Sequence, residues 1–315
     1  MTLTELRYIV AVARERHFGR AARACHVSQP TLSAAVKKLE DELGVTLFER
    51  APNDVRVTAA GSRVIELAQR VLEQAAAIKE LARAAGDELA GPLKVGFLPT
   101  VGPYLLPELI PILHKRAPKM PLVVEEHATE VLRQRLKDGA LDAVLVSLPF
   151  IEPGIVTLPL YEEPFVLALP ANHPLARRKS LTVEALRREN LLLLGPGHCF
   201  RDQVLSVCPV CEAPAGAEHS MQRTLEGSSL ETIRHMVASG MGITLLPCTA
   251  AAGGHYAKKL LVVRRFPGEQ PVRRIALAWR ASFPRPKAIE ALRQAVLGSP
   301  LQCVRKLARA APAAA

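Results

Sequence analysis

The chain has 315 residues, of which 49% are hydrophobic, and a formal net charge of +11 at pH 7. This length allows two or three domains, and no apolar run approaches the roughly 20 residues that a membrane-spanning helix needs. With no signal peptide at its start, the sequence predicts a cytoplasmic protein without membrane contact, in which six cysteines form no disulfide framework. Residues 264–315 hold 11 Lys and Arg against 2 Asp and Glu, so bulk charge alone identifies no binding surface.

Residues 1–58 have the pattern of helices joined by a tight turn. Apolar residues recur at helical spacing from residue 3, and a short helix fits residues 20–25. The third helix is expected over 29–43, with Ser28 as its N-cap, Pro30 in its first turn and Gly44 after its end. Its inward face is Leu32, Val36, Leu39 and Leu43. Its outward side supplies the candidate DNA contacts, which are Gln29, Pro30, Thr31, Ser33, Lys37 and Lys38.

Residues 59–90 predict one long helix that links this segment to the rest of the chain. Its apolar residues recur at steps of three and four, and Gly91-Pro92 ends the pattern. A lone helix with an apolar stripe has no core of its own, so we expect it to pair between subunits.

From residue 91 onward, strand and helix patterns alternate, which is typical of doubly wound α/β layers. A return strand late in the chain predicts a regulatory domain over 91–300 with two lobes. Lobe I comprises about 91–163 and 269–300, and lobe II about 164–268. Residues 301–315 form a C-terminal tail, of which the Ala-rich end is expected to be disordered. The expected strands are 93–97, 122–126, 143–146, 165–169, 191–194, 243–246 and 275–279.

Cys199 and Cys208 are nine residues apart in a segment that reads as a short helix after Gly195-Pro196-Gly197. Such a helix rises about 13–14 Å over nine residues and places the two thiols on opposite faces. Since a disulfide needs Cα atoms within about 7 Å, the pair must refold to react, which indicates a redox switch. Zinc binding by Cys208 and Cys211 with His198 or His219 is the main alternative, although no second ligand pair follows at finger spacing.

The N-terminal residues resemble the LysR-type transcriptional regulators. The match consists of Phe18, Ala21-Ala22, Val27-Ser28-Gln29-Pro30-Thr31-Leu32-Ser33, Leu39-Glu40, Leu43-Gly44, Leu47-Phe48-Glu49-Arg50 and Thr58-Ala59-Ala60-Gly61. The segment Gly197-His198-Cys199-Phe200-Arg201-Asp202-Gln203, followed by Cys208, resembles the peroxide-sensing branch of that family. The resemblance implies a winged helix-turn-helix domain, a linker helix and a two-lobed, periplasmic-binding-protein-like effector domain.

The family resemblance also implies partners for the chain. It implies double-stranded operator DNA, hydrogen peroxide, a homotetramer built as a dimer of dimers, RNA polymerase, and a cellular thiol reductant that resets the switch. No cofactor and no metal ion is expected. In the wing, Arg50 and Arg56 are candidate DNA contacts, and Asn53 replaces a basic residue that many relatives carry, so the wing contact stays open between them.

The resemblance implies roles for the cysteines and for a peroxide pocket. Cys199 would be the peroxidatic thiol, which the helix N-terminus and Arg201 would favour as thiolate. Cys208 would be the resolving thiol, with Cys211 as an alternative. The pocket would contain Thr100, Thr129 and Arg273, with Arg274 as the alternative one position along, and the switch would control antioxidant genes. His198 and Asp202 are i, i+4 neighbours, which predicts either that they hold the peroxide beside Cys199 or that they form a solvated pair. Two alternatives remain, which are a regulator that answers a small carboxylate with inert cysteines, and a thiol peroxidase. We expect a regulator and not an enzyme.

Overall fold

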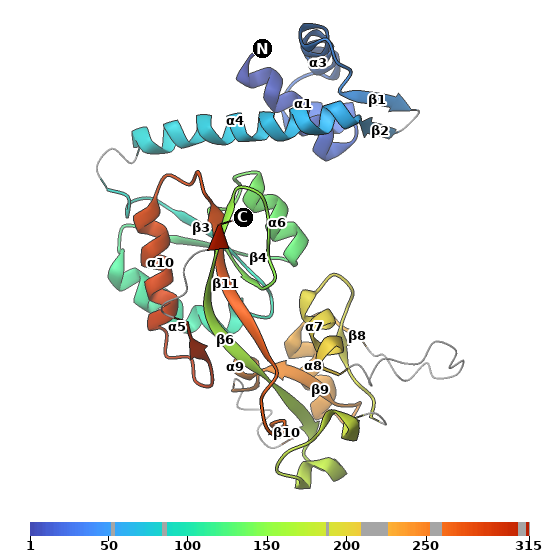
Figure 1. Cartoon of the computed structure of the whole chain (residues 1–315), viewed down its shortest axis with the longest axis vertical. Helices are drawn as coiled ribbons and strands as arrows, with labels where there is room; N and C mark the ends of the chain where they lie inside the picture. Colours follow the sequence, from blue (N-terminus) through green and yellow to red (C-terminus); the bar gives the residue numbers. More distant parts are fainter. Residues whose placement is uncertain are drawn as a thin grey trace. The chain divides into compact units, whose positions relative to one another are not determined.

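The computed structural model describes residues 1–51, 54–83, 87–186, 189–208, 226–252, 260–307 and 313–314 (Figure 1). The chain forms two compact units, Met1–Gly86 and Asp87–Ala315. Each unit has hydrophobic cores of its own, one in the first unit and two in the second.

The first unit is a helix-turn-helix followed by a two-stranded wing and a long helix. Its elements are α1 (Leu3–Glu15), α2 (Phe18–Ala24), α3 (Gln29–Leu43), β1 (Phe48–Ala51), β2 (Asp54–Val57) and α4 (Ala59–Arg83). The wing strands β1 and β2 pair antiparallel. Helix α4 contributes Ile65 and Ala68 to the core and leaves Leu67, Val71 and Ile78 exposed, an apolar face that covers nothing within the unit.

Local chemistry sets the ends of α3 as the sequence predicts. The Ser28 hydroxyl accepts a hydrogen bond from the Thr31 backbone N–H, and Gly44 adopts a left-handed φ of 66° at the C-terminal end. The expected inward face is confirmed at three positions but wrong at Leu43, which is 37% exposed in the last turn. Gly61 is required at the start of α4, because a Cβ there would lie 2.3 Å from the carbonyl oxygen of Leu47.

Lobe I of the second unit is a mixed sheet covered by helices. Strand β3 (Leu93–Phe97) pairs parallel with β4 (Leu122–Glu126) and β5 (Ala143–Ser147). Strand β11 (Val272–Arg280) then pairs antiparallel with β5, which confirms the predicted return strand. The helices of this lobe are α5 (Gly102–Arg116), α6 (Thr129–Lys137) and α10 (Pro286–Gly298).

Strand β6 (Ile155–Pro170) crosses from lobe I into lobe II. Its first part pairs antiparallel with β11, and its last part pairs with β9 (Thr244–Pro247) and β10 (Leu261–Arg264). Lobe II is completed by η1 (Pro174–Arg177), η2 (Val183–Leu186), β7 (Leu193–Leu194), α7 (Cys199–Val207), β8 (Glu226–Gly227), α8 (Leu230–Ala238) and α9 (Cys248–Ala252). The long strands β6 and β11 run side by side in Figure 1 and join the two lobes.

The C-terminal tail adds two short strands to β6. Strand β12 (Arg305–Lys306) pairs antiparallel with residues 161–162, and β13 (Ala313–Ala314) with residues 156–157. The expectation of a disordered Ala-rich end is therefore wrong for residues 313–314, because the edge of β6 offers them backbone partners.

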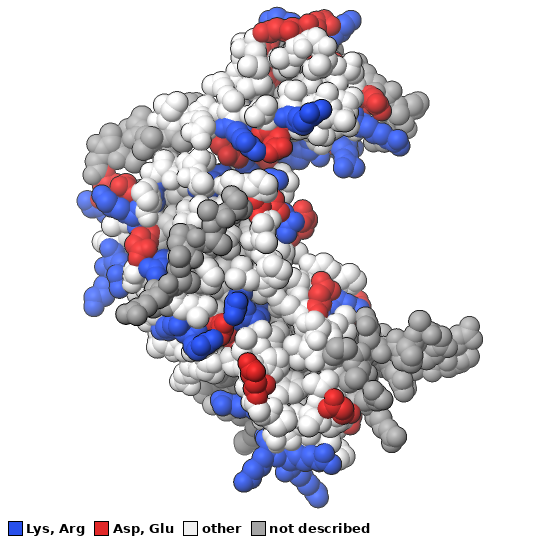
Figure 2. Space-filling view, in the orientation of Figure 1, with Lys and Arg blue, Asp and Glu red and all other residues white. Residues whose placement is uncertain are grey.

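Much of the C-terminal basic excess is used inside the protein. Arg273, Arg280 and Arg285 are all buried. Arg280 donates to the backbone carbonyl of Leu136 in the last turn of α6 and to that of Leu141 after it, and Arg285 donates to three carbonyls of residues 88–92. Figure 2 shows a mostly uncharged visible face with scattered acidic and basic side chains and a group of basic ones at its lower end. The three buried arginines therefore serve the fold, and bulk charge alone identifies no polyanion site.

Candidate functional site

Helix α3 presents a polar face for nucleic acid. Among the predicted contacts, Gln29, Pro30, Thr31, Lys37 and Lys38 are exposed, and Ser33 is half-buried, whereas Leu32, Val36 and Leu39 point into the core. Arg56 on β2 is exposed. Asn53 and the side chain of Arg50 lie outside the described residues, so the wing contact stays a prediction.

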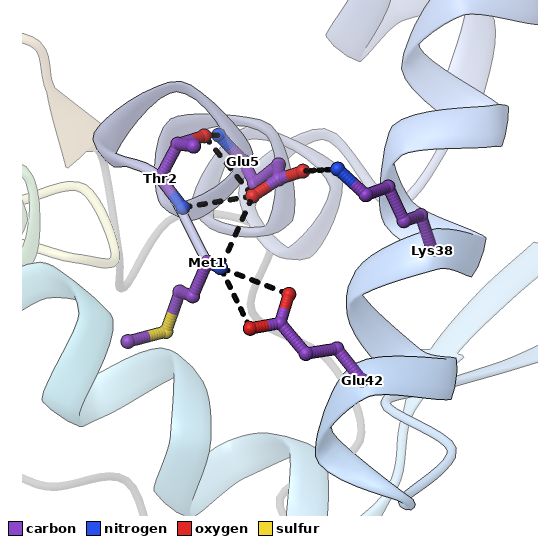
Figure 3. Close-up of polar contacts among 5 residues, drawn as sticks. All are labelled: Met1, Thr2, Glu5, Lys38 and Glu42. Carbon is purple, nitrogen blue, oxygen red and sulfur yellow. Dashed lines mark hydrogen bonds and ion pairs between the residues drawn. The ribbon is translucent and has the colours of Figure 1, made fainter.

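Lys38 differs from its neighbour Lys37. Figure 3 shows Lys38 and Glu42, one turn apart on α3, directed toward the start of α1. The Lys38 Nζ lies 3.3 Å from a carboxylate oxygen of Glu5, and Glu42 accepts from the amino group of Met1. The hydroxyl of Thr2 and, to a smaller extent, Lys38 hold the pKa of Glu5 below its usual value. Lys38 therefore already has an ion-pair partner within the domain.

Cys199 is the first residue of α7 and a half-buried free thiol. His198 is the N-cap residue, and its side chain makes no capping hydrogen bond. The helix runs without a break to Val207, with Cys208 as its C-cap, so a nine-residue helical rise of about 13–14 Å separates the two cysteines. The predicted helix is confirmed, and no Cys199–Cys208 bond can form while α7 is intact.

Cys208 is fully buried and is itself in a disulfide, whose partner is not the free thiol of Cys199. The alternative resolving residue Cys211 lies outside the described residues, as does His219. The described residues contain no group of three or more His, Cys, Asp or Glu arranged to hold a metal ion.

A small pocket lies between the lobes at the N-terminus of α7. Its lining residues come from the loop after β3, the start of α6 and the start of α7: Leu98, Pro99, Thr100, Ala128, Thr129, His198, Cys199 and Phe200. The Thr129 hydroxyl is buried and has no hydrogen-bond partner in the described part of the chain. Of the five predicted pocket residues and the thiol Cys199, four thus meet here, namely Thr100, Thr129, His198 and Cys199, with one hydroxyl available to a small polar ligand.

Asp202 and Arg201 lie differently from the expectation. Asp202 is exposed and is not a lining residue of the pocket. The Arg201 guanidinium donates to the carbonyl of Leu194 and to Glu226 at 2.7 Å, so its charge is paired with a carboxylate. Cys199 itself lies at the N-terminus of α7, where the helix dipole is positive.

Arg273 organises the floor of this region. It is buried, and it donates to the hydroxyl of Thr100 at 2.9 Å and to the Thr100 carbonyl at 2.8 Å. Its Nε donates to Glu163, which is 0% exposed, and its guanidinium lies 5.2 Å from the ring centre of Phe200, next to Cys199. Arg274, the neighbour one position along, instead pairs with Glu162 on the surface, so the buried role belongs to Arg273.

Sequence reasoning missed the residues that hold this arrangement. Glu163 also accepts hydrogen bonds from the backbone and the hydroxyl of Thr249, and the Gln203 amide of α7 donates to the hydroxyl of Ser147 at 2.7 Å. A signal was present, because the register aligns Glu162 and Glu163 with Arg274 and Arg273 across two antiparallel strands. Two acidic neighbours in one segment and two basic neighbours in another are a cross-strand pairing pattern.

Two further cysteines are bonded to each other. Cys248 and Cys303 form a disulfide across 55 residues of sequence. The sequence predicts no disulfide framework, yet this pair is bonded, because the fold brings the C-terminal tail beside α9. Cys25 keeps a free thiol, and burial raises its pKa.

Both units match family models. Residues 3–62 match the bacterial regulatory helix-turn-helix protein, lysR family, and residues 86–299 match the LysR substrate binding domain. None of the described helices is long and apolar enough to cross a membrane. The fold and the family matches together define a DNA-binding transcription regulator with an effector domain, and the chain belongs to the LysR family, in its OxyR branch.

The OxyR relatives cover nearly the whole chain. OxyR of Escherichia coli K12, a DNA-binding transcriptional dual regulator, is 41% identical over 296 residues, which are 94% of this chain and 95% of the relative. The structure of full-length OxyR from Pseudomonas aeruginosa, a cysteine-to-aspartate variant, is 53% identical, covers 98% of both chains and has a TM-score of 0.76. An H2O2-bound mutant of Corynebacterium glutamicum OxyR is 35% identical, covers 94% of this chain and 91% of its own, and has a TM-score of 0.61.

Proposed function

We propose that this protein is a DNA-binding transcription regulator that senses hydrogen peroxide through Cys199 and controls antioxidant genes from the cytoplasm. The observation that carries the proposal is the free, half-buried thiol at the N-terminus of α7, in a pocket with Thr100, Thr129 and His198. The thiolate is the form of a cysteine that attacks a peroxide. Relatives named hydrogen peroxide-inducible genes activator support the choice of oxidant.

The proposed reaction has two steps. The Cys199 thiolate attacks one oxygen of H2O2, the O–O bond breaks, and a sulfenic acid and hydroxide form. The Cys208 thiol then attacks the Cys199 sulfur, releases water and closes the disulfide, with Cys211 as the alternative resolving thiol. The buried, partnerless hydroxyl of Thr129 is placed to bind the peroxide before attack. Since Cys208 is in another disulfide in this structure, a thiol reductant must free it before the second step.

The second step requires a conformational change. Helix α7 must unwind, because an intact helix holds the two cysteines apart. Unwinding breaks the Gln203–Ser147 hydrogen bond between the lobes and moves Phe200 from its stack on Phe165, with ring centres 5.5 Å apart. The free energy released by disulfide formation thus repacks the lobes, and we infer that this alters subunit contacts within a homotetramer and its action on operator DNA and RNA polymerase.

Mass spectrometry after addition of one equivalent of H2O2 tests the switch. The protein is first reduced with thioredoxin, and its disulfides are mapped in the wild type and in Cys199→Ser. A Cys199–Cys208 bond that is absent from the variant supports the proposal. A Cys199–Cys211 bond would assign the resolving role to Cys211. If Cys199 stays a thiol while peroxide is consumed elsewhere, the sensor is wrong and the effector is a small metabolite.

We propose that α3 enters the DNA major groove, as a helix with an exposed polar face after a tight turn does. Gln29 and Ser33 are placed for base contacts, and Lys37 for phosphate. The test compares Lys37→Ala with Lys38→Ala in operator binding at several salt concentrations. We expect Lys37→Ala to reduce the salt slope by about 1, and Lys38→Ala to reduce it less because Lys38 pairs with Glu5. Equal slopes in both variants would contradict this orientation of α3.

We infer regulation instead of peroxidase catalysis. A single oxidation suffices for a switch, whereas a peroxidase must turn over with a reductant. Peroxide consumption in the presence of thioredoxin, its reductase and NADPH separates the two. Turnover limited by slow re-reduction of Cys199 supports a sensor, and sustained turnover of at least about 1 per second, typical of enzymes, would identify a thiol peroxidase.

A further inference from the structure

The Cys248–Cys303 disulfide lies in a position that none of the peroxide chemistry above uses. Cys248 opens α9 directly after β9 and is 5% exposed in the core of lobe II. Cys303 is exposed in the tail after α10, and it has a left-handed φ of 70°. A non-glycine residue rarely adopts this conformation, so contacts in the folded protein hold the backbone at Cys303 in a conformation that is unfavourable in isolation.

The tail that carries Cys303 spans the two lobes. Val304, the next residue, packs against the cores of both lobe I and lobe II. Strand β12 follows at once and pairs with β6, where the carboxylate of Glu162 accepts from Arg305. The disulfide therefore ties the tail, which leaves lobe I after α10, to the first turn of α9 in lobe II.

A continuous set of contacts leads from this disulfide to the Cys199 pocket. Thr249, the neighbour of Cys248, donates its backbone N–H to Glu163 at 3.0 Å. Glu163 in turn accepts from Arg273, which holds Thr100 in the pocket wall and stacks on Phe200. Among the described residues, Glu163 is the only carboxylate that pairs with the Arg273 guanidinium. A displacement of α9 therefore disturbs the residue that holds Arg273 in place.

We propose that Cys248 and Cys303 are a second redox-active couple, and that their disulfide restrains the opening of α7. The exposed Cys303 sulfur is the one that reagents reach first. A dithiol reductant attacks it, Cys248 leaves as the thiolate and takes up a proton, and the second thiol of the reductant releases Cys303, so two thiols form as the reductant becomes a disulfide. In the reverse direction, Cys303 attacks H2O2 to give a sulfenic acid and water, and Cys248 displaces a second water to close the bond.

The closed Cys248–Cys303 bond favours the helical state of α7. The structure contains the closed disulfide together with an intact α7, so the bond holds the contacts of this helical state. When the bond opens, Cys303 is free to leave its left-handed conformation, Val304 loosens from both cores, and Thr249 no longer fixes Glu163. The reduced couple thus makes α7 easier to unwind. The consequence for peroxide sensing rests on the proposed function, but the couple and its effect on α7 do not.

The redox activity of the couple is tested in full-length Cys199→Ser protein, where the proposed sensor thiol is absent. The bonded peptides are counted by mass spectrometry before and after thioredoxin with its reductase and NADPH, and again after one equivalent of H2O2. We expect thioredoxin to open the Cys248–Cys303 bond in the folded protein and peroxide to restore it. A bond that opens only after denaturation, or that never forms, overturns the proposal.

The effect on α7 is measured by hydrogen exchange of its amides. Cys303→Ser removes the bond at an exposed site, and Gln302→Ser, its exposed neighbour, is the matched control. We expect α7 to exchange about fivefold faster or more in Cys303→Ser, the lower end of the coupling found between linked sites, and at the wild-type rate in the control. Equal exchange in all three proteins refutes the coupling. If Cys303→Ser does not fold, Cys303→Ala takes its place, because alkylation of the reduced wild type would also modify Cys199 and Cys208 at the two ends of α7.

Discussion

The buried ion pair of Glu163 and Arg273 gives the sharpest prediction. The two side chains are 0% and 1% exposed, and Glu163 is the carboxylate that accepts from Arg273. In Glu163→Gln the amide oxygen can still accept from Thr249, but the amide N–H groups then face the donors of Arg273, and its positive charge remains buried without a counter-ion. Breaking a buried pair in this way costs about 3–5 kcal/mol.

The adjacent pair provides the control. Glu162 contacts Arg274 and Arg305, whose side chains are 61% and 75% exposed, so solvent screens both interactions. Loss of each such pair costs about 0–1 kcal/mol, so loss of both costs at most about 2 kcal/mol. For a unit of this size each kcal/mol lowers Tm by about 2–4 °C, so we expect Glu163→Gln to lower Tm by roughly 6–20 °C and Glu162→Gln by at most about 8 °C.

Thermal unfolding followed by circular dichroism, with the two variants and the wild type in one buffer, measures the difference. A similar Tm for Glu163→Gln and Glu162→Gln would refute the reasoning, because it would mean that burial of the arginine partner does not separate two carboxylates that are both buried. A large loss in Glu163→Gln alone would also identify Arg273 as the residue that positions the pocket wall.

Three more outcomes follow from single contacts. Gly61→Ala places a Cβ against the Leu47 carbonyl oxygen, so urea unfolding of the first unit should show a loss of about 1–3 kcal/mol. Hydrogen bonds, first from Arg305, hold the pKa of Glu162 below its usual value, so the contribution of Glu162 to stability is present above about pH 4.5 and is lost as the pH falls further. Between pH 6 and pH 3, the Tm of Glu162→Gln should therefore fall less steeply than that of the wild type. Parallel curves would contradict this. Gln203→Ala removes the hydrogen bond that holds α7 to the end of β5, so the Cys199 disulfide should form about two- to tenfold faster in quenched alkylation, and a slower rate would show that this contact assists the reaction.

The pocket at the N-terminus of α7 shows where a residue pattern reaches its limit. The family resemblance predicts Thr100, Thr129 and Cys199, helical spacing predicts His198, and the fold brings all four to one pocket. Asp202 was selected by its helical spacing from His198, and spacing alone does not say which side of a short helix faces the cavity. The disulfide mapping with Cys199→Ser tests whether Cys199 carries out the proposed chemistry.

Helix ends that depend on neighbouring residues can be predicted from the sequence alone. Ser28 and Gly44 delimit α3, and the breaker Gly195-Pro196-Gly197 precedes α7, because a cap or a turn depends on neighbours within a few residues. The incompatibility of an intact α7 with a Cys199–Cys208 bond followed from the rise of a helix and needed no coordinates.

Only the tertiary structure decided the crossing strand and the bonds across it. Residues 155–164 of β6 contain two prolines and two glutamates, which argue against a strand in isolation. They form one because Arg273 and Arg274 neutralise Glu163 and Glu162 from the neighbouring strand. The Cys248–Cys303 bond has the same kind of cause, since its two halves meet only when the tail returns across both lobes. Charge compensation and disulfide pairing depend on distances in space, and the order of residues along the chain does not contain these distances.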